Sequence, residues 1–427
     1  MSAASDKRHD GAARHGRLPR RSPAKTALKA IGIAAVVAVV GAASAGGIAA
    51  WSLAHSAEPS VAFHAAAPSG AAVHKAPALS AFSGEVNMLV VASDTRTGQG
   101  AGFDDAANLR GSSGVGNNDT NLLVHINQQH TSMAVIDLPR DLVVTMPACE
   151  DDTGTVEPAR TGVMLNTALA DGGVNHGLQC VASAVASLTG VQIDYAAMLQ
   201  FDGVVRMTDA IGGVSVCLAT PIVDDNVTPA LDLTAGTHVL QGAQAAAFLR
   251  TRDSVGYGGD TARISNQQVF MSALMRQIVS SGTLSNPVRL YSLASAALKS
   301  VQKSSTLDVP TVVKIALAVK SIGLGNIVFL QYPTVADPAD SAHLLADPDG
   351  VTILKHALST NQAIQLSPGS LGQSARLATP APAATTAPSP ASSAPSSTGA
   401  SSASAAVLPD TSTGQSAAQE TCTGKGD

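Results

Sequence analysis

The chain is organised around the stretch from Phe248 to Gln268, which reads FLRTRDSVGYGGDTARISNQQ. It places three arginines and two aspartates around a glycine-rich turn, although only 13% of all residues are charged. On an extended backbone the side chains of Arg250 and Arg252 point to the same face, because side chains alternate along a strand. On the helix expected after the turn, Arg263 and Gln267 are four residues apart and therefore lie on one side.

Arginines grouped in this way favour a ligand with phosphate groups. Each guanidinium group is a rigid fork that donates two hydrogen bonds to paired oxygens, so several forks together suit a diphosphate. The alternative is a solvated loop with Arg–Asp ion pairs, because structural ion-pair networks use the same residue types as binding sites. The stretch by itself leaves both interpretations open.

The composition argues against several classes of protein. The 427 residues carry a net charge of −5 and the pI is about 6.1, which argues against a nucleic-acid-binding protein. The cysteines form no Cys-x-x-Cys pair and the histidines show no ligand spacing, which argues against a zinc or iron–sulfur site. The sequence also lacks the Gly-x-Ser-x-Gly, His-Glu-x-x-His and Gly-x-x-x-x-Gly-Lys-Ser/Thr motifs of common enzymes.

The cysteines predict a disulfide if the domain is exported, because disulfides persist in oxidising compartments. Two of Cys149, Cys180 and Cys217 are then expected to pair, and the sequence leaves open which two. Cys422 stands alone in the C-terminal tail and is interpreted as incidental.

The N-terminal region predicts a membrane anchor. Residues 1–29 are rich in Lys and Arg, and residues 30–54 carry no charge, which suffices for a bilayer-spanning helix of about 20 residues. Because basic flanks stay cytoplasmic, we expect a single-pass cell-membrane protein with a cytoplasmic basic tail (1–29), a transmembrane signal anchor (30–54) and an extracytoplasmic remainder. The alternative is a signal peptide cleaved near Ala43-Ser44-Ala45, which also implies export.

The remainder predicts one large α/β domain at residues 85–365, after an extracytoplasmic linker at residues 55–84. Apolar runs bounded by turn residues indicate strands at 86–92, 120–126, 133–138, 214–218 and 326–331. Helical patterns occur at 166–170, 177–188, 204–211, 241–248, 262–281, 287–301, 310–321 and 343–358. This alternation indicates a central mixed β-sheet covered by helices on both faces. Residues 366–427, rich in Ala, Ser, Pro and Thr, are expected to be disordered.

Charged residues stand at the ends of three expected strands. Asp94 follows the first strand, Asp119 opens the second and Arg140 follows the third. Ligands of open α/β sheets bind at strand ends, so these side chains are expected to meet. Two carboxylates suit Mg²⁺, which takes one or two of them together with phosphate oxygens. Taken singly, each Asp also fits an ordinary turn or cap.

Short motifs occur in a fixed order between residues 85 and 282. They are Ser93-Asp94-Thr95-Arg96, Asn118-Asp119-Thr120, Leu138-Pro139-Arg140-Asp141, Leu165-Asn166, Asp209-Ala210-Ile211-Gly212-Gly213-Val214, Phe248-Leu249-Arg250-Thr251-Arg252, Gly259-Asp260, Arg263 and Gln267-Gln268. This series resembles the LytR-CpsA-Psr family, in its actinobacterial form. The resemblance implies an extracytoplasmic phosphotransferase, a cell-wall glycopolymer–peptidoglycan ligase. Such an enzyme moves a glycopolymer from a polyprenyl-diphosphate carrier onto peptidoglycan, which leaves a phosphodiester linkage and releases polyprenyl phosphate.

The resemblance also implies a cofactor, partners and roles for individual residues. Mg²⁺ is the implied cofactor, and its implied ligands are Asp94 and Asp119. The implied diphosphate-binding residues are Arg96, Arg140, Arg250, Arg252, Arg263 and Gln267. The implied catalytic residues are Arg140, Arg250, Arg252, Asp94 and Asp119. The implied partners are the polyprenyl-diphosphate-linked glycan, peptidoglycan and, through the N-terminal helix, the membrane, with no nucleic acid.

Two further roles are assigned as hypotheses. The proton of the attacking hydroxyl is accepted by one of Asp94, Asp119 and Asp141, and the sequence does not choose between them. Six apolar residues are candidates for a groove that binds the lipid, and the alternative is that they belong to the ordinary hydrophobic core. They are Leu199, Phe201, Val204, Met207, Ile211 and Phe270.

The sequence departs from the family pattern at several positions. Asn117 and Asn118 stand where the family has an arginine before the second Asp-Thr, and Asn266 stands where an arginine precedes Gln-Gln. Met164-Leu165-Asn166 replaces a Lys-Ile-Asn motif. The loss of these cations keeps open a non-catalytic polyprenyl-phosphate-binding paralogue. A membrane-anchored regulator is a second alternative, against which the acidic net charge argues.

Overall fold

The computed structural model describes residues 60–75, 78–80, 83–97, 114–280, 283–299, 301–378 and 405–426. They belong to one compact unit, Ala57–Asp427. The basic tail and the transmembrane anchor predicted for residues 1–54 lie outside the described residues. Within the described ranges, no helix is long and apolar enough to cross a membrane.

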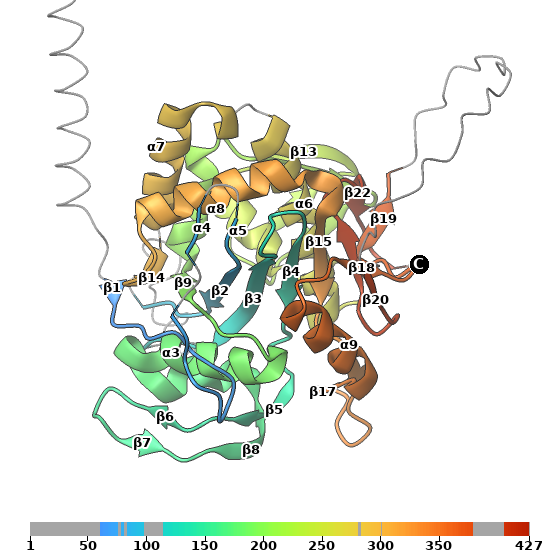
Figure 1. Ribbon diagram of the computed structural model, residues 1–427. Coiled ribbons are helices and arrows are strands. Elements are labelled where there is room, and N and C mark those ends of the chain that lie inside the picture. The colour runs from blue at the N-terminus through green and yellow to red at the C-terminus, as the bar shows by residue number, and fades with distance from the viewer. Residues whose placement is uncertain are drawn as a thin grey trace, which may run out of the picture. The chain divides into compact units, whose positions relative to one another are not determined.

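An eight-stranded sheet forms the centre of the fold (Figure 1). In spatial order its strands are β1 (Ser60–Val61), β14 (Val301–Ser304), β9 (Tyr195–Leu199), β2 (Val86–Ser93), β3 (Asn118–Ile126), β4 (Met133–Asp137), β15 (Ile327–Gln331) and β21 (Gly414–Ser416). The pairs β1–β14, β9–β2 and β4–β15 are parallel, and the other neighbouring pairs are antiparallel. The predicted mixed sheet is therefore confirmed.

The helices match the predicted ones closely. Within the described residues the α-helices are α3 (Ala168–Thr189), α4 (Phe201–Ala210), α5 (Gly242–Arg250), α6 (Asp260–Ser280), α7 (Pro287–Leu298), α8 (Val309–Ile322) and α9 (Pro348–Ser359). The two helices predicted at 166–170 and 177–188 are halves of α3, which is kinked at Gly173 with φ of 70°. Helix α9 begins later than predicted because a short strand, β17 (Leu344–Ala346), precedes it.

Helices cover both faces of the main sheet, because alternate side chains of each strand point to opposite faces. Leu89 and Val91 of β2 belong to a core that includes residues of α3 and α9. Met88 and Val90 face the other way, into a core that includes residues of α6, α7 and α8. In Figure 1, α8 lies above the sheet and α3 below it. One α/β domain with a sheet covered on both faces is thus confirmed.

A second, four-stranded sheet packs against α5 and α6. Its order is β13 (Gly236–Leu240), β10 (Val214–Leu218), β22 (Thr421–Thr423) and β19 (Ala375–Leu377). Val216 of β10, Phe248 of α5 and Phe270 of α6 belong to the third hydrophobic core. Phe270 is only 2% exposed, so of the two predicted roles, lipid groove or ordinary core, the structure supports the core.

Short strand pairs and 3₁₀ turns complete the described part of the chain. The strand pairs are β5 (Val143–Met146) with β8 (Arg160–Met164), β6 (Cys149–Glu150) with β7 (Val156–Glu157), β11 (Ile222–Asp224) with β12 (Leu231–Leu233), β16 (Thr334–Ala336) with β17, and β18 (Ile364–Leu366) with β20 (Ala406–Leu408). The 3₁₀ turns are Leu165–Thr167, Thr283–Ser285 and Leu324–Asn326.

The structure corrects both predicted boundaries of the folded domain. The segment predicted as a linker at residues 55–84 contains strand β1. It also contributes the buried side chains of Val61, Phe63 and Ala66 to the core, so the folded domain already includes residue 60. The tail predicted to be disordered over residues 366–427 contains β19, β20, β21 and β22. Residues 379–404, which hold most of its Ala/Ser/Pro/Thr composition, lie outside the described residues.

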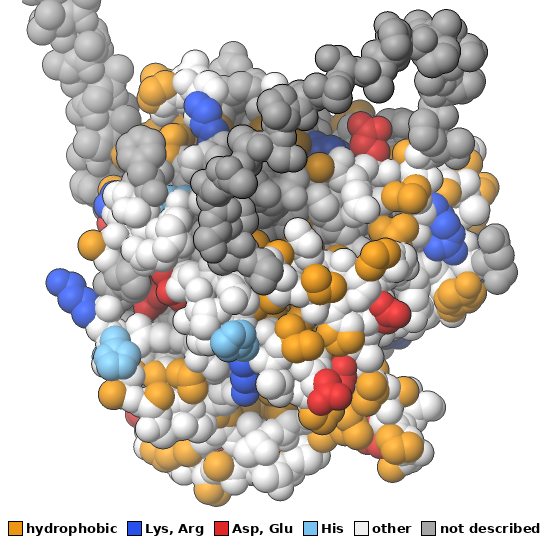
Figure 2. All heavy atoms as spheres, turned by 45° about the vertical axis from the view of Figure 1, so that its right-hand side comes forward, with side chains coloured by type: hydrophobic (Ala, Val, Ile, Leu, Met, Phe, Trp, Pro, Cys, Tyr) orange, Lys and Arg blue, Asp and Glu red, His pale blue; other side chains and the backbone are white. Residues whose placement is uncertain are grey.

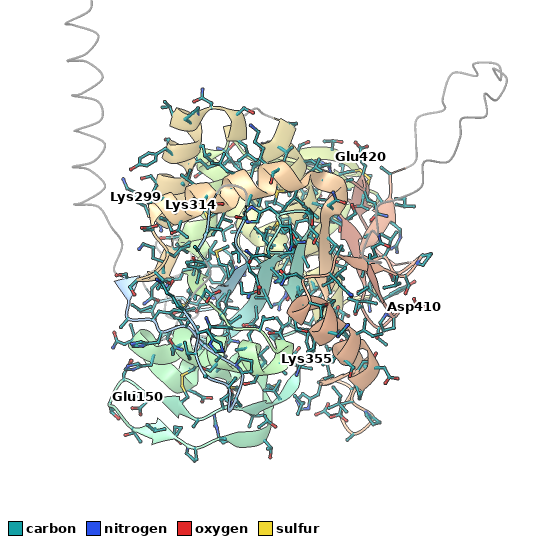
Figure 3. The ribbon with its side chains drawn as sticks, in the orientation of Figure 1. Glu150, Lys299, Lys314, Lys355, Asp410 and Glu420 are labelled. Carbon is teal, nitrogen blue, oxygen red and sulfur yellow. A yellow bond between two sulfur atoms is a disulfide. The ribbon has the colours of Figure 1, made fainter. Side chains whose placement is uncertain are left out.

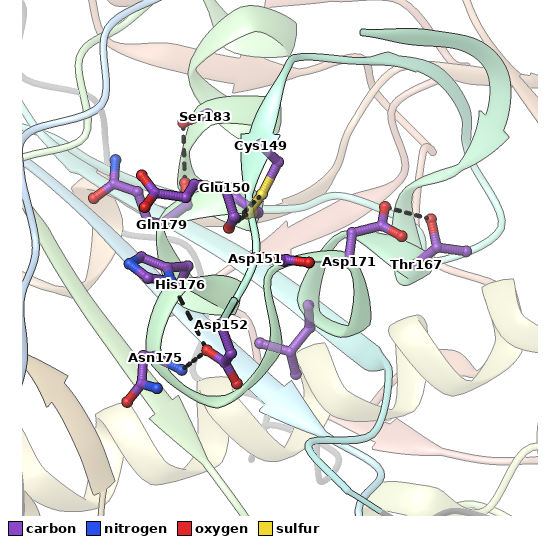
Figure 4. Close-up of a disulfide and its surroundings, with 12 residues drawn as sticks. Cys149, Glu150, Asp151, Asp152, Thr167, Asp171, Asn175, His176, Gln179 and Ser183 are labelled. Carbon is purple, nitrogen blue, oxygen red and sulfur yellow. Dashed lines mark hydrogen bonds and ion pairs between the residues drawn. A yellow bond between two sulfur atoms is a disulfide. The ribbon is translucent and has the colours of Figure 1, made fainter. Parts of the chain in front are cut away.

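All four cysteines are paired. Cys149 pairs with Cys180, and this bond ties β6 to α3 (Figure 4). The Asp152 carboxylate beside it accepts hydrogen bonds from the backbone N–H groups of Val174 and Asn175, directly after the kink of α3. Cys217 pairs with Cys422, so the interpretation of Cys422 as incidental is wrong.

Candidate functional site

A group of charged side chains gathers at one edge of the main sheet. On the face shown in Figure 2, charged side chains are few and scattered among hydrophobic and uncharged ones. Strands β2, β9 and β4 run in the same direction, so their C-terminal ends lie at one edge of the sheet. The charged residues Asp94 and Arg140 follow β2 and β4 there, and the aromatic residue Phe201 follows β9. These residues lie at the edge where ligands of α/β sheets bind.

The two predicted metal-binding carboxylates lie on the neighbouring strands β2 and β3. Ala92 pairs with Thr120 and Ser93 with Asn118, so Asp119 is the extra residue of a β-bulge. A bulge redirects the side chain that it contains. Oδ1 of Asp94 accepts a hydrogen bond from the backbone N–H of Asn117 at 2.7 Å.

A glycine allows the backbone to approach Asp94 this closely. Gly116 has φ of +73°, in the region that favours glycine, and a Cβ added to it would lie 2.6 Å from Oδ1 of Asp94. The position of the Asp94 carboxylate is therefore set by the loop that leads into β3.

Two arginines share the carboxylates of Asp119 and Asp260. Nη1 of Arg140 lies 3.0 Å from Oδ1 of Asp119, and its Nε lies 3.2 Å from Oδ1 of Asp260. Arg263, which is in the first turn of α6, places Nη2 2.5 Å from Oδ1 of Asp260. The same nitrogen donates a hydrogen bond to the backbone oxygen of Asp119 at 2.9 Å. Helix α6 is thereby tied to the bulge of β3.

Burial and the neighbouring charges shift the pKa values of Asp260 and Arg140 in opposite directions. Burial raises the pKa of the Asp260 carboxyl, and the guanidinium groups of Arg263 and Arg140 oppose the rise. Burial acts to lower the pKa of the Arg140 guanidinium, but Asp119, Asp260 and Asp141 together outweigh it and raise that pKa. Arg140 is therefore a fixed cation with an excess of negative partners.

Arg96 and Arg250 lie over the same aromatic ring. The guanidinium carbon of Arg250 is 4.5 Å from the centre of the Phe201 ring, and that of Arg96 is 5.7 Å from it. Burial, followed by the charge of Arg96, lowers the pKa of Arg250 to about 10, so Arg250 is still charged at neutral pH. The electron-rich face of the ring stabilises two like charges that would otherwise repel each other. Phe201, predicted as a lipid-groove candidate, thus contacts the arginines.

Replacing Phe201 by leucine is expected to lower kcat/KM for the transfer reaction proposed below by about tenfold, because each cation–π contact is worth about 0.5–2 kcal/mol. Leucine keeps most of the volume but not the charge-stabilising ring. Phe201→Tyr is the matched control and should retain activity within about twofold of wild type. Steady-state kinetics on both variants would contradict this role if leucine and tyrosine behaved alike.

Arg252 and Gln267 lie differently from expectation. The extended backbone predicted at Arg250 is wrong, because Arg250 is the last residue of α5. The Arg252 side chain is 49% exposed and makes its ion pair with Asp253 at 3.8 Å. Gln267 donates its side-chain N–H to the backbone oxygen of Leu249 at 2.9 Å. The structure therefore brings together Asp94, Arg96, Asp119, Arg140, Arg250 and Arg263, whereas Arg252 turns to solvent and Gln267 contacts the backbone before Arg250.

Two asparagines of the motif regions, Asn118 and Asn266, have buried side chains. Asn118 donates to Oδ1 of Asn121 at 2.7 Å and to the backbone oxygen of Leu165 at 3.0 Å, and accepts from the N–H of Leu169 at 3.0 Å. Asn266 is likewise fully buried. Both side chains join elements of the fold and do not line the charged group.

Two acidic residues of this region, Asp137 and the Asp260 described above, are not among the site residues predicted from the sequence. Asp137, the last residue of β4, is 3% exposed. Burial, together with the charge of Asp260, raises its pKa to about 8, and Arg263 opposes the rise. Its carboxyl group is therefore mainly neutral at pH 7. In the sequence Asp137 stands near the end of an apolar run, and no motif around it indicates that it belongs to the charged site.

The residues that could hold a metal ion here are Asp94 and Asp119. Among the described residues, no group of three or more His, Cys, Asp or Glu side chains is placed to hold a metal ion. Both carboxylates, however, lie close enough to Arg250 to act on its pKa. Mg²⁺ typically binds one or two carboxylates together with phosphate oxygens and water, which matches this donor set.

The fold and the charged group define a mixed α/β protein with a candidate anion-binding site at its strand ends. The chain belongs to the LytR_cpsA_psr family, whose model matches residues 54–357. The resemblance inferred from the motifs is therefore confirmed.

Two proteins from Corynebacterium glutamicum are similar to this chain in sequence. The chain is 29% identical over 275 residues to the cell wall biosynthesis protein LcpA, which covers 60% of this chain and 51% of LcpA. It is 33% identical over 236 residues to the probable cell wall biosynthesis protein LcpB, which covers 55% of this chain and 52% of LcpB. The chain spans about half the length of these relatives.

Solved structures also resemble this fold. The LytR-Csp2A-Psr enzyme from Actinomyces oris matches with a TM-score of 0.47 and 19% identity, covering 70% of this chain and 96% of that one. A structure described as TagT bound to LI-WTA matches with a TM-score of 0.49 and 16% identity, covering 71% of this chain and 99% of that one. These likenesses concern the fold alone.

Proposed function

We propose that this protein is an extracytoplasmic phosphotransferase that moves a glycopolymer from a polyprenyl-diphosphate carrier onto peptidoglycan. The observation that carries the proposal is the convergence of four arginines and two carboxylates at one edge of the sheet. Membership of the LytR_cpsA_psr family and the names of the two cell wall biosynthesis relatives support the coarser part of the proposal, a role in cell wall biosynthesis. Several fixed cations suit a diphosphate, because phosphoryl transfer depends mainly on positioning and charge stabilisation.

In the proposed reaction a hydroxyl oxygen of peptidoglycan attacks the phosphorus that bears the glycan. The bond from that phosphorus to the bridging oxygen breaks, and polyprenyl phosphate leaves with the bonding electron pair. The hydroxyl proton passes to one of Asp94, Asp119 and Asp141. Arg250 and Arg96 bind the diphosphate oxygens from one side, and the Arg140–Arg263 network holds Asp119 in place. Mg²⁺ held by Asp94 and Asp119 would neutralise charge on the leaving phosphate.

The proposed location is the outer face of the cell membrane. Residues 30–54 would form a single transmembrane signal anchor behind a cytoplasmic tail at residues 1–29. The two disulfides support an exported domain, because reducing compartments keep cysteines free. The polyprenyl-linked donor would then reach the domain from the membrane to which it is anchored.

The proposal is tested with the full-length protein in detergent, a short lipid-diphosphate-sugar and peptidoglycan fragments. Release of polyprenyl phosphate and formation of a sugar–phosphate–peptidoglycan product are measured together. A binding-only paralogue, the alternative kept open by the asparagines at positions 117, 118 and 266, would bind the lipid and release nothing.

Removal of divalent metal is expected to slow the reaction by about tenfold or more, because the cation stabilises charge that builds up on phosphate oxygens. The measurement compares initial rates in EDTA and after Mg²⁺ is restored. Asp94→Asn should reproduce the loss in the presence of Mg²⁺. Equal rates with and without metal would remove Mg²⁺ from the proposal.

A further inference from the structure

The C-terminal segment at residues 405–426 is built into both sheets. Strand β21 forms the edge of the main sheet beside β15, and β22 lies between β10 and β19 in the second sheet. Asp410 and Glu420, labelled in Figure 3, stand between β20 and β21 and between β21 and β22. The segment therefore reaches from the main sheet to the elements that carry Arg250 and Arg263.

The end of this segment holds the glycine-rich turn in place. The backbone N–H of Gly256 donates to the oxygen of Gly424 at 2.8 Å, and the N–H of Gly426 donates to the oxygen of Gly256 at 2.5 Å. The contact is close, because a Cβ at Gly426 would lie 2.4 Å from the Tyr257 ring. Gly424 in turn donates its N–H to the oxygen of Ser374 at 2.9 Å. The turn between α5 and α6 is thus joined to the C-terminal segment by a β-bridge at Gly256.

Side chains of α6 cap the C-terminal end of α5. The last carbonyl groups of a helix lack partners within the helix. Nδ2 of Asn266 donates to the oxygen of Phe248 at 2.8 Å, and Nε2 of Gln267 donates to the oxygen of Leu249 at 2.9 Å. Both carbonyl groups lie in the last turn of α5, directly before Arg250.

Thr423 of β22 orients the first of these caps. Its Oγ1 donates to Oδ1 of Asn266 at 2.7 Å, and both side chains are fully buried. An amide that accepts at its oxygen must present its NH₂ group elsewhere, here to Phe248. A hydroxyl on the C-terminal strand thereby sets the amide that caps the helix carrying Arg250.

We propose that Thr423 and Asn266 are positioning residues that hold the end of α5, and with it Arg250, at the charged group. This rests on the function proposed above and adds the C-terminal strand to the machinery.

Thr423→Val removes the hydroxyl and keeps the shape of the side chain. We expect kcat/KM for polyprenyl phosphate release by the full-length protein to fall about tenfold, because small displacements of a binding group cost large factors in rate. Thr423→Ser, which restores the hydroxyl, should return activity to within about twofold of wild type. Thr421→Val is the matched control, since Thr421 is also buried in β22 and donates to Oε1 of Gln415 at 2.9 Å.

A second measurement does not depend on catalysis. Hydrogen exchange at the Thr251 amide, which donates to the oxygen of Ala247 at 3.1 Å, reports on the end of α5. Thr423→Val should speed this exchange by about tenfold and Thr421→Val should not. Equal exchange in the two variants, or equal activity in both after correction for folded protein, would overturn the positioning role. If the wild type itself releases no polyprenyl phosphate, the proposed function fails, and the exchange data still decide the role of Thr423.

Discussion

Replacing Arg250 by alanine is expected to lower kcat/KM for polyprenyl phosphate release by about 10²–10³-fold, the usual cost of removing one charge-stabilising donor. Arg250 remains charged at neutral pH although burial lowers its pKa to about 10. A charge kept in a largely buried place interacts more strongly with phosphate oxygens than one in water. Arg250→Lys, which keeps the charge but not the fork, should recover only part of the loss.

Arg206 provides the matched control for this substitution. It lies on α4, its side chain is 54% exposed, and it pairs with Asp202 at 3.9 Å. Arg206→Ala should leave activity within about twofold, since exposed ion pairs contribute little. Arg252→Ala, made in parallel, measures whether the half-exposed arginine reaches the substrate. The role of Arg250 would be refuted if its alanine variant kept more than about a third of the wild-type rate.

Loss of the Cys217–Cys422 disulfide is expected to lower the free energy of unfolding by about 4–5 kcal/mol, because it closes a very long loop. The two cysteines are separated by 205 positions. The double variant Cys217→Ser/Cys422→Ser removes the bond without leaving a free thiol, and urea denaturation measures the change. Without the bond β22 is held only by its backbone pairs and buried side chains, so activity should fall with stability.

The Cys149–Cys180 disulfide offers a control of the same chemistry. Its cysteines are separated by 31 positions, so the double serine variant should lose about 3–4 kcal/mol, less than the longer loop. It ties β6 to α3, away from α5 and α6, and the folded fraction should keep its activity. A larger loss for the shorter loop would contradict the entropic argument.

Four of the eight strands of the main sheet could be predicted, because their apolar runs are bounded by turn residues. Strands β2, β3, β4 and β15 stand out in this way. Strands β9 and β14 do not, since Tyr195–Leu199 carries two alanines and Val301–Ser304 is short and polar. Their strand conformation comes from pairing with β2 and with each other, which is a tertiary effect.

The residues of the candidate site could be named from motifs, but their geometry could not. The two-residue spacing of Arg250 and Arg252 puts both side chains on one face only of an extended backbone, whereas in the structure Arg250 is the last residue of α5. The prediction of disorder over the whole tail fails because its composition, rich in Ala, Ser, Pro and Thr, gives no sign of the three short strands β20, β21 and β22 near the C-terminus. Strand β22 reads Thr-Cys-Thr and is held by its neighbours and a disulfide, not by local propensity.

The place of β22 between β10 and β19 has a consequence for how a nascent chain matures. Cys217 of β10 is paired in register with Cys422, which a ribosome adds 205 positions later. At roughly 5–20 residues per second this delay is about 10–40 s, during which that edge of β10 lacks its native neighbour. Unpaired edges invite association with other chains. Production of this protein should therefore gain from chaperones that shield the exposed edge of β10 until β22 is in place.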